Sequence, residues 1–193
     1  MTQPDLLAAL APVVTELERL GVAYSVVGSV ASSAHGIARA SLDADLVADL
    51  AARHIDSLVT ALQGDYYIER DAVTEAVSRR SMFNVVHLAT MLKVDVYVLT
   101  ARPFDVASFG RRRPGELDAF SGRRYALATA EDTVLHKLGW YRDGGDVSER
   151  QWGDVVGVLK VQGGDLDVDY MHRWAVALGV DDLLQRAIQE AGS

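Results

Sequence analysis

The sequence predicts an α+β protein in which a sheet with interspersed helices is followed by helices alone. Up to about residue 126, short segments rich in β-branched and aromatic residues alternate with segments of helical apolar spacing. From about Ala130 onward every apolar pattern has helical spacing. The chain has 193 residues, 49% of them hydrophobic, which suits one domain or a compact domain with a helical appendage. We therefore expect an α+β region over 1–126 and a helical region over 127–193.

The first region opens with a helix over about Pro4 to Leu20, because Leu6, Leu10, Val13, Leu17 and other apolar residues recur at helical spacing before Gly21. The segments predicted next are a strand at 24–27, a helix with Ser29 at its N-terminus, a strand ending at Ala48, a helix over 52–62 and a short strand at 66–68. Two alternating segments, 81–88 and 91–99, are predicted to form a hairpin that turns at Ala89 and Thr90.

The second region is predicted to hold four helices, separated in part by Gly144-Gly145 and Gly163-Gly164. Their predicted ranges are 131–140, 148–161, 169–178 and 181–191. The tryptophans at 140, 152 and 174 lie on these amphipathic helices. They are expected in the core, with one of them stacking on a nucleotide base as the alternative.

Composition and charge narrow the classes of function. The chain has no cysteine, which excludes disulfides, thiolate metal sites and a cysteine nucleophile. We see no basic and apolar leader and no apolar run long enough for a bilayer, so we expect a cytoplasmic protein without membrane association. The net charge of −8 disfavours duplex nucleic acid as a partner. The arginine clusters at 79–80, 111–113 and 123–124 are expected at the solvated surface, with an RNA or phosphate groove as the alternative.

Asp43 and Asp45 form the most informative pair of residues. Two acids separated by one residue on a strand point to the same face and repel each other. A cation between them removes that cost, and Mg²⁺ (or Mn²⁺) is the natural candidate because it prefers oxygen ligands and substrate phosphates. The alternative is a solvated acid pair at a strand end.

Gly28-Ser29 lies between the strand at 24–27 and the helix that follows. A glycine at such a junction lets the backbone approach an anion closely and directs free N–H groups at it. An ordinary turn between strand and helix is the alternative. Together, a phosphate-binding turn and metal-binding acids would supply the two halves of a nucleoside triphosphate site.

Asp95 is the third candidate acid. In the segment around it, Val94, Val96 and Val98 share one face of a strand, and Lys93, Asp95 and Tyr97 share the other. An acid within such an apolar strand is unfavourable unless it is paired or holds a metal, although an edge strand with a wet polar face is the alternative. Two strands that present three carboxylates are typical of two-metal phosphoryl and nucleotidyl transfer.

These motifs resemble the nucleotidyltransferase superfamily, whose catalytic core is a small mixed sheet flanked by helices, as in DNA polymerase beta. The segments that carry the resemblance are Gly28-Ser29-Val30-Ala31, His35-Gly36, Arg39, Ser41-Leu42-Asp43-Ala44-Asp45-Leu46 and Leu92-Lys93-Val94-Asp95. More narrowly, they are similar to AbiEii-type and related uncharacterised bacterial nucleotidyltransferases. Lys137 stands where that group has a helix lysine, and Asp154 where it has a fourth acid.

The resemblance implies a role for each residue. Asp43, Asp45 and Asp95 would hold Mg²⁺ and be catalytic, with Asp95 as the base for an acceptor hydroxyl. Gly28, Ser29 and Lys137 would bind the triphosphate. Lys93 would pair with Asp95 or bind phosphate, and Arg39 and Ser41 would contact the nucleotide or fix the loop before Asp43.

Three functions remain open from the sequence. The first is transfer of an NMP unit from an NTP to a hydroxyl of a tRNA, a protein or a small molecule, with a toxin-like role and an antitoxin partner or a homo-oligomer as extensions. The second is a non-catalytic module that binds a nucleotide or a partner chain. The third is an interaction protein whose acids are merely solvated. The long spacer before Asp43 and the small Ala44 between the acids leave room for the second function.

Overall fold

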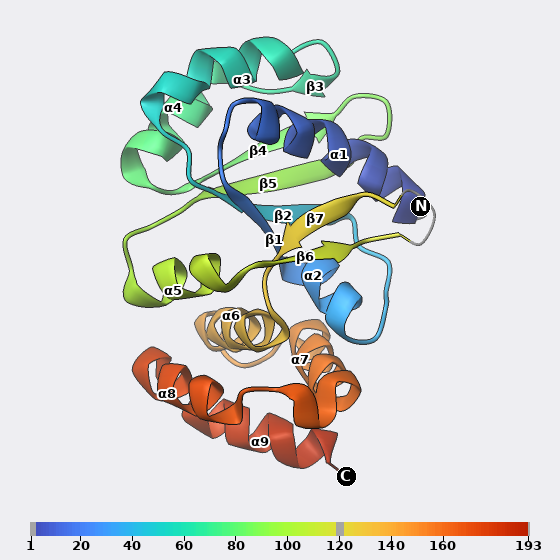
Figure 1. The fold of residues 1–193 in the computed structure, drawn as a ribbon, viewed down its shortest axis with the longest axis vertical. Helices are drawn as coiled ribbons and strands as arrows, with labels where there is room; N and C mark the ends of the chain where they lie inside the picture. The colour runs from blue at the N-terminus through green and yellow to red at the C-terminus, as the bar shows by residue number, and fades with distance from the viewer. Residues whose placement is uncertain (1–2, 119–121, 193) are drawn as a thin grey trace.

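The structure is a computed structural model that describes residues 3–118 and 122–192 (Figure 1). At its centre, the described residues form a seven-stranded sheet in the order β3-β4-β5-β2-β1-β7-β6. The strands are β1 (Tyr24–Val27), β2 (Asp43–Ala48), β3 (Tyr66–Tyr67), β4 (Met82–His87), β5 (Lys93–Val98), β6 (Arg113–Glu116) and β7 (Arg124–Leu127). β2 is parallel to β5 and β1 is parallel to β7, while the other neighbours are antiparallel. The prediction of a mixed sheet in an α+β fold is confirmed.

Helices cover both faces of this sheet. They are α1 (Gln3–Arg19), α2 (Gly28–His35), α3 (Ile55–Leu62), α4 (Arg70–Arg79), α5 (Pro103–Arg111), α6 (Ala130–Asp143), α7 (Glu149–Gln162), α8 (Val168–Leu178) and α9 (Asp181–Ala191), with 3₁₀ turns η1 (Ala52–His54) and η2 (Gly163–Asp165). Figure 1 shows α1, α3 and α4 on one side of the sheet, α2, α5 and α6 on the other, and α8 and α9 as an outer layer. Within the described ranges, no helix is both long and apolar enough to cross a membrane.

The alternation of side chains along the central strands decides which face carries chemistry. Val26, Leu46, Val94 and Val96 are almost fully buried in the core cluster that also contains the apolar side chains of α1 and α3. The intervening residues therefore point to the opposite face. On β2 and β5 these intervening residues include all three acids predicted as the site.

The C-terminal helices enclose a second hydrophobic cluster, to which Leu135, Val155, Met171 and Leu184 belong. Strand β7 ends at Leu127 and α6 begins at Ala130, so the change from sheet to helices falls next to the predicted residue 126. Helix α2 connects the two parts. His35 Nε2 donates to the carbonyl oxygen of Ala128 at 2.7 Å, and the Gln162 side chain donates to the carbonyl oxygen of His35 at 2.6 Å.

Several elements differ from the sequence prediction. The helix expected over 52–62 begins with the 3₁₀ turn η1, and α2 begins at Gly28, with Val27 rather than Ser29 as the residue before its first turn. Strand β5 lies between β2 and β4, so the alternative of an edge strand is wrong. Four elements were not predicted: α4, α5, β6 and β7.

The unpredicted elements have weak sequence patterns. Helix α4 buries only Val73 and Ala76, and β6 has the turn-like sequence Arg-Pro-Gly-Glu, paired with β7 through Gly115 and Tyr125. We expected the arginines at 111–113 at the solvated surface, but Arg111 is partly buried. Arg111 pairs with Glu131 and Asp132 and stacks on the ring of Tyr170.

Candidate active site

The pairing of strands brings the acids together. In the parallel ladder of β2 and β5, Asp43 is opposite Lys93 and Asp45 is directly opposite Asp95. Asp45 is also opposite Val27, the last residue of β1. One row across the sheet therefore joins two of the three acids to the start of the Gly28-Ser29 turn.

Gly28 is required by this arrangement. Its φ of +64° lies in the left-handed region, and a Cβ at this position would be 1.9 Å from Asp45 Oδ2 and 2.9 Å from Asp45 Cβ. Rotation of the Asp45 carboxylate would not relieve the second contact, because Cβ moves with the backbone. The turn and the carboxylate consequently pack against each other, which only glycine permits.

The surroundings of Asp45 change its ionisation. Burial raises the pKa of Asp45 to about 6, with further increases from the negative charges of Asp43 and Asp95. Lys137 and Lys93 partly oppose this increase. Burial also raises the pKa of Tyr97 to about 12, and the same three acids add to that increase. The site thus concentrates negative charge that the two lysines only partly offset.

Asp95 is the most buried of the three acids, with 5% of its surface exposed. Its Oδ2 accepts a charge-assisted hydrogen bond from Lys93 Nζ at 2.8 Å. Its Oδ1 is buried and has no partner among the described residues. A buried carboxylate oxygen without a partner is costly, so this atom is suited to accept a proton or to bind a cation.

The two serines form a short relay beside Asp43. Ser41 Oγ donates to Asp43 Oδ1 at 3.1 Å, and the Ser29 and Ser41 hydroxyls are 2.6 Å apart. Because Ser41 has one hydroxyl proton and gives it to Asp43, Ser29 is the donor to Ser41. These hydrogen bonds join Ser41, in the loop before β2, to Asp43 and to Ser29.

Arg39 and Lys137 converge on Asp154 of α7. Arg39 donates through Nε to Oδ1 at 2.6 Å and through Nη2 to Oδ2 at 2.7 Å, and Lys137 Nζ lies 2.8 Å from Oδ2. Burial alone would raise the pKa of Asp154, but the hydrogen bonds from Arg39 and Lys137 outweigh it and hold the pKa below its ordinary value. These contacts tie the loop before β2 to α6 and α7.

A cleft of about 760 Å³ opens above these residues. Its lining includes every residue predicted for the site except Lys93. Lys93 forms an ion pair with Asp95, which does line the cleft. The cleft is also lined by Tyr97 and the segment 147–151, which were not predicted for the site, and by Trp140, for which stacking on a base was the alternative. Two signals pointed to them: Tyr97 shares a strand face with Asp95, and Trp140 follows Lys137 by three residues on a helix.

Asp43, Asp45 and Asp95 are the residues that could hold a divalent cation. In the side-chain positions observed for 3–118 and 122–192, no three carboxylate or imidazole side chains are arranged around one point for a metal ion. Two observations nevertheless fit a cation: the unpartnered Oδ1 of Asp95 and the raised pKa of Asp45. The donor set consists of hard oxygens, as Mg²⁺ prefers.

The fold is similar to that of solved nucleotidyltransferases. No family model matches the sequence, and no curated protein matches it. The structure is similar to that of the antibiotic-resistance factor ANT(2'')-Ia, with a TM-score of 0.57, 13% identity and coverage of 91% of this chain and 96% of that chain. It is similar to a nucleotidyltransferase-like protein from Paracoccidioides brasiliensis, with a TM-score of 0.57, 14% identity and coverage of 96% of this chain and 93% of that chain.

A third similar structure is the lincosamide antibiotic adenylyltransferase LnuA with lincomycin bound, with a TM-score of 0.51 and 16% identity over 83% of this chain and 98% of that chain. At these identities the comparisons establish the fold. The chain has the nucleotidyltransferase fold over almost its whole length. The narrower resemblance to AbiEii-type proteins stays a prediction.

Proposed function

We propose that this protein is a Mg²⁺-dependent nucleotidyltransferase that transfers NMP from an NTP to a hydroxyl-bearing acceptor. The observation that carries the proposal is the row in which Asp95, Asp45 and the Gly28 turn adjoin at one end of the sheet. Two of the similar structures are described as complexes with adenylyl-2''-tobramycin and with lincomycin. A small hydroxyl compound is therefore our first choice of acceptor, ahead of a tRNA or a protein.

In this proposal the chain's own residues divide the work. The backbone of the Gly28-Ser29 turn binds the phosphates, and Asp43, Asp45 and Asp95 hold the cation. When bound, Mg²⁺ neutralises the triphosphate and stabilises the charge on the leaving pyrophosphate. Lys137, at the edge of the cleft, adds a positive charge near the same phosphates.

The Asp95 carboxylate accepts the proton of the acceptor hydroxyl through the oxygen that does not bind the cation. The acceptor oxygen then forms a bond to the α-phosphorus while the bond from that phosphorus to the bridging oxygen breaks. The electron pair of the broken bond leaves with pyrophosphate. The proton, the new ester and pyrophosphate account for all atoms of the step.

A non-catalytic module that binds a nucleotide or a partner chain is the second candidate. It is favoured by the ion pair between Lys93 and Asp95 and by the pairing of both Arg39 and Lys137 with Asp154. These pairs neutralise charges that catalysis would direct at the substrate and the cation. An antitoxin or a second copy of the chain would be the partner in that case.

The test combines binding with turnover. We would measure the melting temperature with each NTP and Mg²⁺ or Mn²⁺, and pyrophosphate release with panels of tRNA, protein and small hydroxyl compounds. A catalytic protein is expected to be stabilised by an NTP and to release pyrophosphate with at least one acceptor. Asp45→Asn should abolish both effects. Asp49→Asn, which alters an exposed carboxylate just beyond the end of β2, should leave both unchanged.

Stabilisation by an NTP without turnover, and with Asp45→Asn abolishing it, would favour the non-catalytic module. No stabilisation by any NTP would contradict nucleotidyl transfer and a nucleotide-binding module, and would leave only a module that binds a partner chain.

A further inference from the structure

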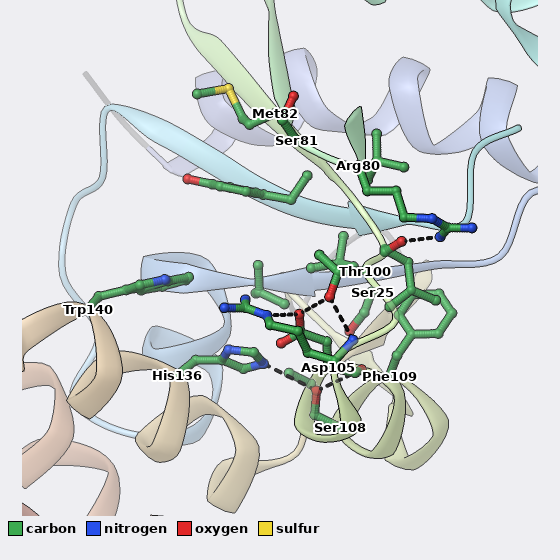
Figure 2. Close-up of a pocket in the computed structure, with 17 residues that line it drawn as sticks. Ser25, Arg80, Ser81, Met82, Thr100, Asp105, Ser108, Phe109, His136 and Trp140 are labelled. Carbon is green, nitrogen blue, oxygen red and sulfur yellow. Dashed lines mark hydrogen bonds and ion pairs between the residues drawn. The ribbon is translucent and has the colours of Figure 1, made fainter. Parts of the chain in front are cut away.

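A second cavity, of about 320 Å³, lies beside the acid cleft on the same face of the sheet (Figure 2). Its roof is formed by β1, β2 and β5, and its other walls by α5 and α6. The cavity and the cleft share two lining residues, Tyr97 and Trp140, whose rings are stacked with centroids 6.4 Å apart. A molecule in the cavity would therefore reach the acid cleft past these two rings.

The cavity is far less charged than the cleft. Val27, Val47, Met82 and Phe109 contribute apolar surface. Figure 2 shows polar groups of the lower wall bonded to one another, Thr100 to Asp105 and Ser108 to His136. Arg102 also donates to Asp105. Burial lowers the pKa of His136, which keeps the imidazole neutral near pH 7. The lining thus suits an uncharged ring system and offers no cluster of acids to a polycation.

One polar atom in this cavity is unsatisfied. Ser25 lines the roof and is only 2% exposed, and its Oγ has no hydrogen-bond partner among the described residues. Ser25 shares a strand face with Val27, so its side chain is on the side of the cavity rather than of the main core. A buried hydroxyl without a partner is unfavourable, and a polar group of a ligand would satisfy it.

We propose that this cavity binds the acceptor, and that the acceptor is a small, uncharged, ring-containing compound with a polar group for Ser25 and a hydroxyl at its other end. This inference rests on the proposed nucleotidyl transfer. The separation between Ser25 and Asp95 supports it. Ser25 is opposite Val47 and Val47 is opposite Tyr97, a distance of about 10 Å across two strand spacings, and Tyr97 is about 7 Å along its strand from Asp95. An acceptor of two fused rings anchored at Ser25 would present its hydroxyl past the edges of Tyr97 and Trp140 toward Asp95.

The binding test uses 2-naphthol and naphthalene as a pair of probes that differ by one hydroxyl. Ser25→Ala should weaken binding of 2-naphthol about fivefold, the loss of one ordinary hydrogen bond, and leave binding of naphthalene unchanged. The matched control is Thr133→Val, which removes another buried hydroxyl without a partner, on α6 but outside the cavity lining. Thr133→Val should change the affinity for neither 2-naphthol nor naphthalene. Because Ser25→Ala and Thr133→Val each remove a buried hydroxyl without a partner among the described residues, both variants should fold.

Absence of 2-naphthol binding to the unaltered protein would overturn the proposal, as would an equal effect of Ser25→Ala on both probes. A crystal soaked with 2-naphthol should show the hydroxyl within hydrogen-bond distance of Ser25 Oγ, and density at any other place only would contradict the assignment.

The melting temperature with MgATP is measured on the same samples, so that the two proposals fail separately. If MgATP stabilises the protein and an acceptor from the panel is turned over, but 2-naphthol does not inhibit that turnover, the acceptor lies elsewhere while nucleotidyl transfer stands. If no NTP binds, nucleotidyl transfer fails and the acceptor role of the cavity fails with it.

Discussion

At the scale of single residues, the geometry of the site depends on Gly28 and Asp154. Gly28 combines a left-handed backbone with a position in contact with Asp45, and Asp154 joins two basic side chains in a buried position. Gly28 can be compared with Gly21, which has a similar φ but no close contact. The buried ion pairs of Asp154 can be compared with the exposed pair of Glu75 and Arg79.

Gly28→Ala should lower the free energy of unfolding by about 3 kcal/mol, from the left-handed backbone and the collision with Asp45 together. Gly21 has nearly the same φ, +67°, but a Cβ there would meet nothing within 4 Å, so Gly21→Ala should cost only about 1 kcal/mol. Urea unfolding of the two variants measures the difference. Equal losses would show that the contact with Asp45 is not a constraint.

Asp154→Asn should destabilise the protein by about 3 kcal/mol at pH 7, because it leaves the buried Lys137 ammonium without its charged partner. The pKa of Asp154 is lowered in the folded protein, so its stabilisation is present above an unfolded pKa of about 4 and is lost as the pH falls toward the native pKa.

The difference in stability between Asp154→Asn and the unaltered protein should therefore shrink below about pH 4. Urea unfolding from pH 7 to pH 3 measures it. Glu75→Gln, which breaks an exposed pair with Arg79, is the control and should have little effect at any pH. A difference that stays constant with pH would contradict the assigned ion pair.

At the scale of elements, the close approach of α2 and α7 holds the Asp154 contacts in place. A Cβ on Gly36, at the end of α2, would lie 2.8 Å from the backbone nitrogen of Val158. Because the atoms that this Cβ would meet belong to the backbone of α7, that helix as a whole would have to move. Asp154 lies one turn before Val158 on the same helix and would move with it.

Gly36→Ala should consequently cost about 2 kcal/mol, in the range of other overpacked substitutions. Gly153→Ala places a methyl group in open space on the same helix and should stabilise it by about 1 kcal/mol. Thermal unfolding compares the two. A neutral or stabilising Gly36→Ala would mean that α7 is not held against α2 as the structure has it.

At the scale of the whole molecule, two hydrophobic clusters are connected by α2 and by the ion pairs of Asp154. The three tryptophans, Trp140, Trp152 and Trp174, all lie in α6, α7 and α8. Tryptophan fluorescence therefore reports the C-terminal helices, while far-ultraviolet circular dichroism reports the helices of both parts.

We expect the two signals to give the same midpoint in urea, because the links between the clusters make them one cooperative unit. Added MgATP should shift both midpoints equally if the proposed site is correct. Separate midpoints would show that the C-terminal helices unfold independently of the sheet.

The sequence by itself determined the α+β class and the positions of β1, β2, β4, β5 and the four C-terminal helices. It also placed Asp43 and Asp45 on one face of their strand and Asp95 on the polar face of its own. These features follow from local periodicity, since a period of two or 3.6 residues is written along the chain. Helices α4 and α5 and strands β6 and β7 escaped prediction because their apolar patterns are short. Strand β6 exists because its backbone pairs with β7.

Only the tertiary structure decided which residues of different segments meet. The parallel register put Asp45 opposite Asp95, and packing of α6 and α7 brought Lys137 and Asp154 to Arg39. The same packing left Ser25 Oγ without a hydrogen-bond partner in 3–118 and 122–192, in a cavity whose lining includes Tyr97 and Trp140. Periodicity fixes the face on which a side chain lies, but contacts between distant segments depend on strand order and helix packing, which no local pattern encodes.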